Sequence, residues 1–156
     1  RRCHMSLYLV RHGHSLPKDE DPEQGLSDTG RADTRRLAEV AGGYQVPVSI
    51  IQHSTKKRAR ETAAIFKDVL NPGQGLEEIK GIKPMDDIIP VADSLTPDGN
   101  LMLVSHLPFL SRLTAWLVTG NADIPVIVFQ NSGIVCLDKV DPGGWTIQWA
   151  LMPYIS

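Results

Sequence analysis

The sequence predicts a single three-layer α/β/α domain with a mostly parallel sheet. Short apolar runs alternate along the chain with segments whose apolar residues recur at helical spacing, and this alternation is typical of β-α-β units. A length of 156 residues with 42% hydrophobic content suits one ordinary domain with one substantial core. We therefore expect one domain over residues 6–156, preceded by a disordered or cloning-derived N-terminus over residues 1–5.

The first strand and helix are predicted in the N-terminal quarter of the chain. The apolar run at 6–10 predicts a strand, and the polar, acidic stretch at 18–24 predicts an exposed, mobile loop. Ser27 is suited to cap the next helix, since its hydroxyl oxygen can accept a hydrogen bond from the first turn. This helix is expected over 28–41, before two glycines, with Val40 on its inner face.

The next strand and helix are predicted from the same kinds of apolar and helical pattern. Strand character at 48–52 precedes a helical pattern at 55–70, which the Asn-Pro-Gly sequence at 71–73 should end. The segment from 73 to 100 is rich in glycine and proline and predicts no regular element.

The C-terminal third predicts four strands and one helix. Residues 101–105 form a buried strand, and Pro108 suits the first turn of a helix that reaches about residue 118. Three further strands are expected, at 126–129, 133–138 and 145–151.

Composition excludes several classes of function. The net charge of -2 gives no electrostatic footprint for nucleic acid and no polybasic segment for a membrane surface. No apolar run approaches the length of about 20 residues that spans a bilayer. The two cysteines, Cys3 and Cys136, form neither a disulfide framework nor a metal-binding pattern, which indicates a reducing, cytoplasmic location.

Histidines and arginines lie where three predicted strands end. Arg11 and His12 follow the first strand, His53 ends the second and leads to Arg58, and His106 follows the third. Since parallel strands bring their carboxyl ends to one edge of a sheet, these side chains should converge there, near positively polarised helix N-termini. A guanidinium beside an imidazole suits a phosphoryl group better than a metal, because its donors match phosphate oxygens and its charge repels cations.

Helical spacing separates Arg58 from the other basic residues of its helix. One stripe of the helix carries Arg58, Thr62, Ile65 and Val69. Arg58 should therefore begin an inward-facing row, whereas a solvent-facing position is expected for Lys57, Arg60 and Lys67.

Four ordered pieces of sequence resemble the histidine phosphatase superfamily (phosphoglycerate mutase-like), and within it the small bacterial phosphohistidine phosphatases of the SixA type. The pieces are Leu9-Val10-Arg11-His12-Gly13, Leu26-Ser27-Asp28-Thr29-Gly30-Arg31, Ser54 with Arg58-Ala59 and Thr62-Ala63, and Val104-Ser105-His106-Leu107-Pro108. The resemblance implies a phosphoglycerate mutase-like fold, and the short chain leaves no room for the large helical lid of bigger members.

The same resemblance implies the roles of the site residues. His12 is the nucleophile, Arg11 and Arg58 bind phosphate, and His106 is a second histidine of the catalytic and substrate-binding pocket. Gly13 lets the chain turn closely behind the nucleophile, at a substrate-binding position. No metal and no cofactor are expected.

The implied chemistry is a covalent phosphohistidine on His12, which water hydrolyses to release inorganic phosphate. No clear carboxylate acid is present, and Asp86 and Asp87 are the nearest candidates, each equally readable as a solvated loop residue. A phosphohistidine substrate has a labile P–N bond and tolerates a weak acid better than an ester does. We therefore expect a phosphorylated partner protein, such as a histidine phosphotransfer domain or a phosphocarrier in signal transduction.

Other polar residues are expected to have structural roles. His14 and Lys18 should be exposed, His53 should support the site or the fold, and Ser54 should cap the helix that carries Arg58. Packing roles are expected for Trp116, Trp145 and Trp149.

Three alternative functions stay open from the sequence. The first is a phosphatase that uses the same site on small phosphoesters. The second is a metal-dependent hydrolase in which His12 and His14 form a His-x-His pair that His53 and His106 complete. The third is a module that binds phosphate without turning it over.

Overall fold

The structure is a computed structural model that describes residues 6–96, 99–140 and 143–155. The expectations for residues 1–5, including Cys3, fall outside the described residues. No helix in the described part of the chain is both long and apolar enough to cross a bilayer.

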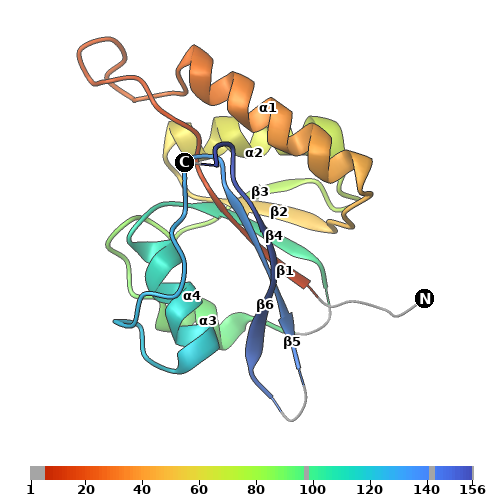
Figure 1. The fold of residues 1–156 in the computed structure, drawn as a ribbon. Helices are drawn as coiled ribbons and strands as arrows, with labels where there is room; N and C mark the ends of the chain where they lie inside the picture. The colour runs from red at the N-terminus through yellow and green to blue at the C-terminus, as the bar shows by residue number, and fades with distance from the viewer. Residues whose placement is uncertain (1–5, 97–98, 141–142, 156) are drawn as a thin grey trace.

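The centre of the fold is one six-stranded sheet with the strand order β3-β2-β4-β1-β5-β6 (Figure 1). The strands are β1 (Ser6–Arg11), β2 (Ile50–His53), β3 (Leu76–Glu78), β4 (Leu101–Ser105), β5 (Ile134–Lys139) and β6 (Trp145–Leu151). The first four strands pair in parallel, whereas β5 runs antiparallel to both β1 and β6. The predicted mostly parallel sheet is confirmed.

Helices cover both faces of this sheet. One face carries α1 (Asp28–Gly43) and α2 (Lys57–Leu70), and the other carries α3 (Ile89–Ser94) and α4 (Phe109–Thr119) (Figure 1). The three-layer α/β/α architecture is therefore confirmed, and among the described residues no large helical insertion lies over the sheet edge.

Strand β1 lies at the centre of both cores because every second side chain points to the same face. Tyr8 and Val10 pack in the core beneath α1 and α2, while Leu7 and Leu9 pack in the core beneath α4. All four are buried, which explains why a continuous apolar run rather than an alternating one predicts this strand.

Two elements in the segment from 73 to 100 were not predicted. Strand β3 is an edge strand with three exposed residues, and α3 is a six-residue helix without a buried residue. Neither element buries one face completely, so its apolar residues do not recur with a regular spacing. The sequence therefore gives no pattern that would predict either of them.

Other expectations on local structure are wrong. Strand β2 begins two residues later than expected, at Ile50. No strand forms at 126–129, where Val128 is exposed and Phe129 alone is buried. Val40 is on the partly exposed side of α1, and the cap of α2 is Lys56 with no side-chain hydrogen bond rather than Ser54.

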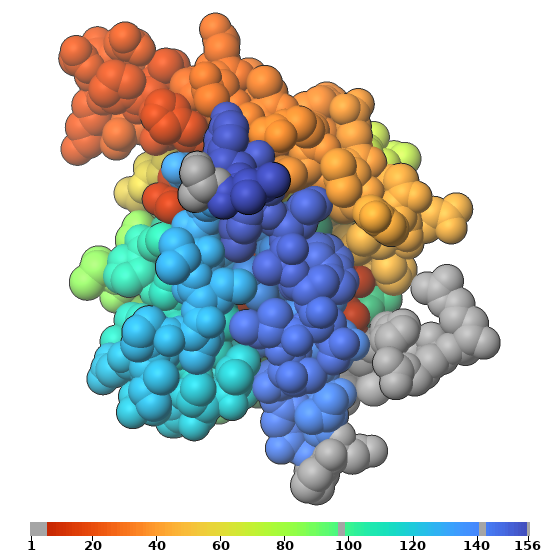
Figure 2. Space-filling view, viewed as in Figure 1, coloured from red at the N-terminus to blue at the C-terminus, as the bar shows by residue number. Residues whose placement is uncertain are grey.

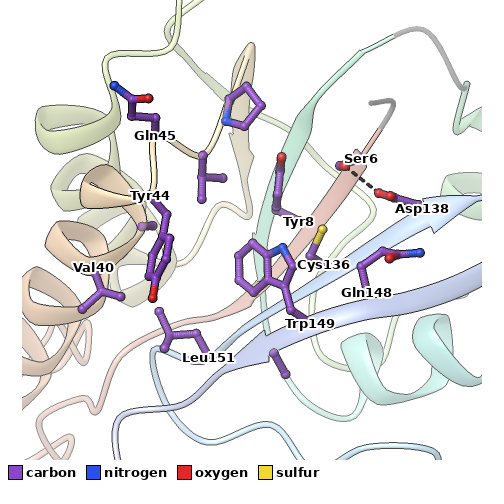
Figure 3. Close-up of a pocket in the computed structure, with 14 residues that line it drawn as sticks. Ser6, Tyr8, Val40, Tyr44, Gln45, Cys136, Asp138, Gln148, Trp149 and Leu151 are labelled. Carbon is purple, nitrogen blue, oxygen red and sulfur yellow. Dashed lines mark hydrogen bonds between the residues drawn. The ribbon is translucent and has the colours of Figure 1, made fainter. Parts of the chain in front are cut away.

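An apolar groove separates the end of α1 from β5 and β6 (Figure 3). Trp149 lines it and packs against Tyr8 with ring centroids 6.1 Å apart. Trp149 and Trp145 thus have the predicted packing roles, whereas Trp116 is 38% exposed. The buried Cys136 thiol, whose pKa burial raises to about 12, also lines this groove.

The turn after β1 is packed against the first turn of α1. Ser27 caps α1 as predicted, since its side chain accepts a hydrogen bond from Gly30 N, and its own N–H donates to the His14 carbonyl. Gly30 lies so close to this backbone that a Cβ atom there would collide with the His14 carbonyl.

Gly30→Ala is expected to lower the free energy of unfolding by about 1–3 kcal/mol, because the added methyl group forces two backbone segments apart. Urea unfolding of the purified variant measures this change. Gly43→Ala is the matched control, since a Cβ atom at Gly43 meets no atom within 4 Å. Equal unfolding midpoints for the two variants would contradict the close-packing argument.

Candidate active site

Strand order brings the predicted histidines together at one edge of the sheet. Strand β4 lies between β1 and β2, and Arg11 pairs in register with Ser105. His12 and His106, which follow these two residues, are therefore neighbours, with ring centroids 5.0 Å apart. The crevice outside the carboxyl ends of β1 and β4 is where open α/β sheets bind ligands.

The hydrogen bonds of His12 define its tautomer. Nδ1 lies 2.8 Å from the Gly13 carbonyl oxygen, which can only accept, so Nδ1 carries the ring proton. Nε2 then holds a lone pair, and it accepts a hydrogen bond from Arg58 Nε at 3.3 Å. The ring nitrogen that faces the arginine is thus the one that can act as a nucleophile.

Backbone contacts fix the position of His12. Its N–H donates to the Ser105 carbonyl at 3.0 Å, and its own carbonyl accepts from Asn131 Nδ2 and Ser132 N, each at 3.2 Å. These bonds come from β4 on one side and from the loop before β5 on the other. His12 is therefore held by segments that lie far from it in sequence.

Gly13 packs against two helices. Its N–H donates to Thr62 Oγ1 at 2.9 Å, and a Cβ atom would come within 2.8 Å of Thr34 Oγ1. The close turn expected at Gly13 is present. The substrate contact at Gly13 stays a prediction, and its N–H already donates to Thr62 in this structure.

Two half-buried guanidinium groups flank the histidines. Arg11 donates from Nη1 to the Phe129 carbonyl at 3.0 Å, while its buried Nε has no partner in the structure. Burial lowers the pKa of both Arg11 and Arg58, but guanidinium groups keep their charge at neutral pH. Among the described residues neither forms an ion pair with a carboxylate. Their charges are thus available to an anion.

His106 is more deeply buried than His12. Its Nε2 lies 2.6 Å from Ser54 Oγ, and its buried Nδ1 has no partner. Burial lowers the pKa of His106 to about 3, aided by His12 and Arg58, and burial likewise lowers the pKa of His12 to about 4. Both rings are neutral at pH 7, so the two arginines supply the positive charge of the free site.

Comparison with known proteins agrees with this geometry. The sequence model of the histidine phosphatase superfamily (branch 1) matches residues 7–86, which is half of the chain. The chain belongs to the histidine phosphatase superfamily. A comparison with curated protein sequences gave no match.

Solved structures of histidine phosphatases share the whole fold. The protein histidine phosphatase SixA complexed with tungstate is 27% identical to this chain, covers 95% of this chain and 97% of its own, and has a TM-score of 0.82. A protein assigned as the phosphohistidine phosphatase SixA from Agrobacterium tumefaciens is 21% identical, covers 97% and 100%, and has a TM-score of 0.77. A mycobacterial glucosyl-3-phosphoglycerate phosphatase complexed with VO3 is 16% identical, covers 94% and 98%, and has a TM-score of 0.70.

The low pKa values make the stability of this histidine phosphatase depend on pH. Between about pH 6.5 and pH 4 an unfolded histidine is protonated while His12 and His106 stay neutral, so the unfolded state binds more protons. The free energy of unfolding is therefore expected to fall as the pH drops through this window. Urea unfolding at pH 7 and pH 4.5 measures the fall, which should be smaller in His106→Asn. An unchanged pH dependence in that variant would contradict the buried neutral ring.

The two other described histidines, His14 and His53, hydrogen-bond to groups other than His12 and His106. His14 is exposed and its Nδ1 lies 2.7 Å from Ser27 Oγ, and His53 is buried with Nδ1 2.9 Å from the Ser54 carbonyl. The described residues contain no group of three or more histidine, cysteine or carboxylate side chains arranged to hold a metal ion. The set of four histidines that the metal-dependent alternative requires is therefore not brought together in the described residues.

A protruding loop precedes the first turn of α1 (Figure 2). Lys18 is exposed on this loop as predicted. Lys57 is not simply solvated, because it forms an ion pair with Asp21 at 2.9 Å. Glu61 accepts from Leu26 N, so two side chains of α2 hold the base of the loop beside the site.

The two candidate acids are engaged in local turns. Asp86 Oδ2 accepts a hydrogen bond from Lys83 N at 2.8 Å, and Asp87 Oδ1 accepts from Ile89 N at 3.0 Å. The structure shows no contact from either carboxylate to His12 or His106. A role for them as general acid stays a prediction from the sequence.

Two parts of the site were missed by sequence reasoning. Ser54 contacts His106 rather than capping α2, and the loop before β5 binds both Arg11 and His12 through Phe129 and Asn131. The polar Asn-Ser-Gly sequence at 131–133 was a usable signal for a turn. Because β5 runs antiparallel to β1, it begins where β1 ends, and the loop before it therefore lies at the site. The sequence does not reveal that strand direction, so the turn could not be recognised as part of the site.

Proposed function

We propose that this protein is a metal-independent phosphatase that forms a covalent phosphohistidine on His12 and hydrolyses it with water. One observation carries the proposal: Nδ1 of His12 is tied to a backbone carbonyl, so the lone pair of Nε2 faces a guanidinium group. That arrangement supplies an oriented neutral nucleophile beside a cation that attracts a phosphoryl group.

The first step transfers the phosphoryl group to the enzyme. His12 Nε2 forms a bond to phosphorus while the bond to the leaving group breaks, and the leaving group takes the bonding electron pair and then a proton from solvent. Negative charge on the three equatorial oxygens is stabilised by donors of Arg58 and Arg11, which act in a half-buried site where such contacts are stronger than in water.

The second step releases inorganic phosphate. A water molecule forms a bond to phosphorus, the P–Nε2 bond breaks and its electron pair returns to His12. The proton lost by the water passes to the released phosphate or to solvent. The hydrogen bond from Nδ1 to Gly13 stabilises positive charge on the ring during both steps.

The substrate proposed for this site is phosphohistidine on a partner protein, such as a histidine phosphotransfer domain or a phosphocarrier in cytoplasmic signal transduction. The P–N bond is labile and needs less acid assistance than an ester, and Asp86 and Asp87 hydrogen-bond to local backbone N–H groups rather than to the two histidines. Among the described residues no large helical lid restricts access by a protein. The 27% identical structure is also described as a protein histidine phosphatase.

A single-turnover assay tests this proposal. The intact protein in chelator-treated buffer is mixed with a phosphotransfer domain that carries labelled phosphorus on histidine, quenched in alkali, and digested for mass analysis of the His12 peptide. Label that passes through His12 and appears as inorganic phosphate is the expected result. Turnover of small phosphoesters alone would move the substrate to small molecules. Phosphate binding without any turnover would contradict a catalytic role.

A further inference from the structure

Ser54 places a hydroxyl group against the second histidine of the site. The residue follows β2 directly and has no exposed surface, and its Oγ lies 2.6 Å from His106 Nε2. Its other partner is the backbone N–H of Lys56, which donates to Oγ at 3.3 Å. Ser54 therefore connects the start of α2 with the imidazole that follows β4.

The hydroxyl group of Ser54 can donate one hydrogen bond and can also accept hydrogen bonds. Because Lys56 N–H already donates to Oγ, the hydroxyl proton of Ser54 is free to go to His106 Nε2, which then acts as acceptor. The neutral His106 ring must in that case carry its proton on Nδ1. Of the side-chain polar groups of Ser54 and His106, this N–H alone is then left without a partner.

The opposite arrangement satisfies fewer groups. If His106 Nε2 carried the proton and donated to Ser54, the hydroxyl proton would lose the acceptor that the structure provides. The buried Nδ1 would hold an unpaired lone pair as well. Since unpaired buried polar groups are unfavourable, the hydrogen-bond count selects the first arrangement.

We propose that Ser54 is a positioning residue that fixes neutral His106 as its Nδ1–H tautomer, so that the ring offers a hydrogen-bond donor to a phosphoryl oxygen held at His12. The inference rests on the proposed phosphatase function. It gives the unpartnered Nδ1 a role, since the two rings lie side by side at the end of β1 and β4. The other tautomer would present a lone pair to an anion and weaken its binding.

The surroundings of His106 explain why the neutral tautomer matters. The charged or titratable groups that act on the ring are His12 directly after β1, Lys56 directly before α2 and Arg58 in the first turn of α2, and none of them is an acid. These groups and the burial of the ring all disfavour imidazolium. A neutral N–H donor is therefore the contribution of His106 to the free site, and its direction depends on the partner of Nε2.

Nitrogen NMR on the intact wild-type protein tests the tautomer directly. Protein with ¹⁵N-labelled histidine is studied at pH 7, and the ring signals of His106 are assigned by their loss in His106→Asn. Protonated Nδ1 and unprotonated Nε2 are expected, with Nδ1–H shifting when tungstate is added. A wild-type ring protonated at Nε2 would overturn the proposal without any Ser54 variant.

Two substitutions then separate positioning from general structural support. Ser54→Ala is expected to move the ring proton toward Nε2, and Ser54→Thr should restore Nδ1–H because it keeps the hydroxyl group. Ser105→Ala is the matched control, since it removes an equally buried hydroxyl group that donates to the Ile82 carbonyl at 2.6 Å rather than to an imidazole. It should leave the His106 tautomer as in the wild type.

Kinetics on the same variants provide the second readout. Ser54→Ala is expected to lower kcat by about 10- to 100-fold with a much smaller change in KM, because a correctly directed donor acts mainly on the charge of the transition state. A loss of kcat with an unchanged tautomer would show a merely structural role and overturn the proposal. The tautomer is observed without turnover, so absent phosphatase activity and a wrong tautomer are separate results.

Discussion

His12→Ala is expected to lower kcat/KM by about 10⁴-fold or more, because it removes the atom that receives the phosphoryl group. The fold should be kept, since the backbone N–H and carbonyl of this residue make the bonds to Ser105 and Asn131 whatever the side chain. Steady-state kinetics on a phosphoester, together with the unfolding midpoint of the variant, separate loss of chemistry from loss of structure.

His14→Ala is the matched control for this experiment. It removes a second imidazole, two residues away from His12. That ring is exposed and hydrogen-bonded to the Ser27 side chain. This variant should keep near-normal kcat/KM. Near-normal turnover by His12→Ala would instead remove His12 as the nucleophile, and equal losses in the two variants would point to disruption of the turn.

Arg58→Ala is expected to lower kcat/KM by about 10²- to 10³-fold, the size of effect seen when one preorganised donor to a developing negative charge is lost. The same change should raise the pKa of His12, because the charge of Arg58 helps to keep that pKa low. Kinetics and an NMR titration of His12 measure the two effects. Arg58→Lys should recover only part of the activity, since an ammonium group lacks the planar fork of donors.

Arg60→Ala provides the comparison for Arg58. Arg60 is on the exposed side of α2, two residues from Arg58, where a charge contributes little. Its removal should leave both kcat/KM and the His12 titration unchanged. Losses of similar size at the two positions would mean that net charge near the site, rather than the contact with His12, sets the rate.

The parts of the fold that the sequence predicted well are those whose burial is complete. Strands β1 and β4 each contain a continuous run of four apolar residues packed between helices on both faces, and Ser27 caps α1 through its own side chain. The information for these elements is local. Strand β3 and helix α3 could not be predicted, since their positions depend on neighbours in space and their own residues show no hidden face.

The residues of the candidate site also divide into those that the sequence could predict and those that it could not. Arg11, His12 and His106 could be predicted because each lies at or directly after the end of a strand whose carboxyl end must lie at the ligand edge. Ser54 and the loop before β5 could not, because their contacts depend on strand order and on the antiparallel direction of β5. Sequence position therefore predicted the candidate reacting groups, while the groups that orient them required the structure.

The central place of β1 also determines when activity can arise during synthesis. Leu7 pairs with Leu101 on one side and with Leu137 on the other, so the ribosome must make most of the chain before β1 has either neighbour. Such distant pairings make folding slow, because a long loop must close before its contacts form. A nascent chain carries His12 from the start but cannot orient it, and phosphatase activity is expected to appear only after β5 has left the exit tunnel.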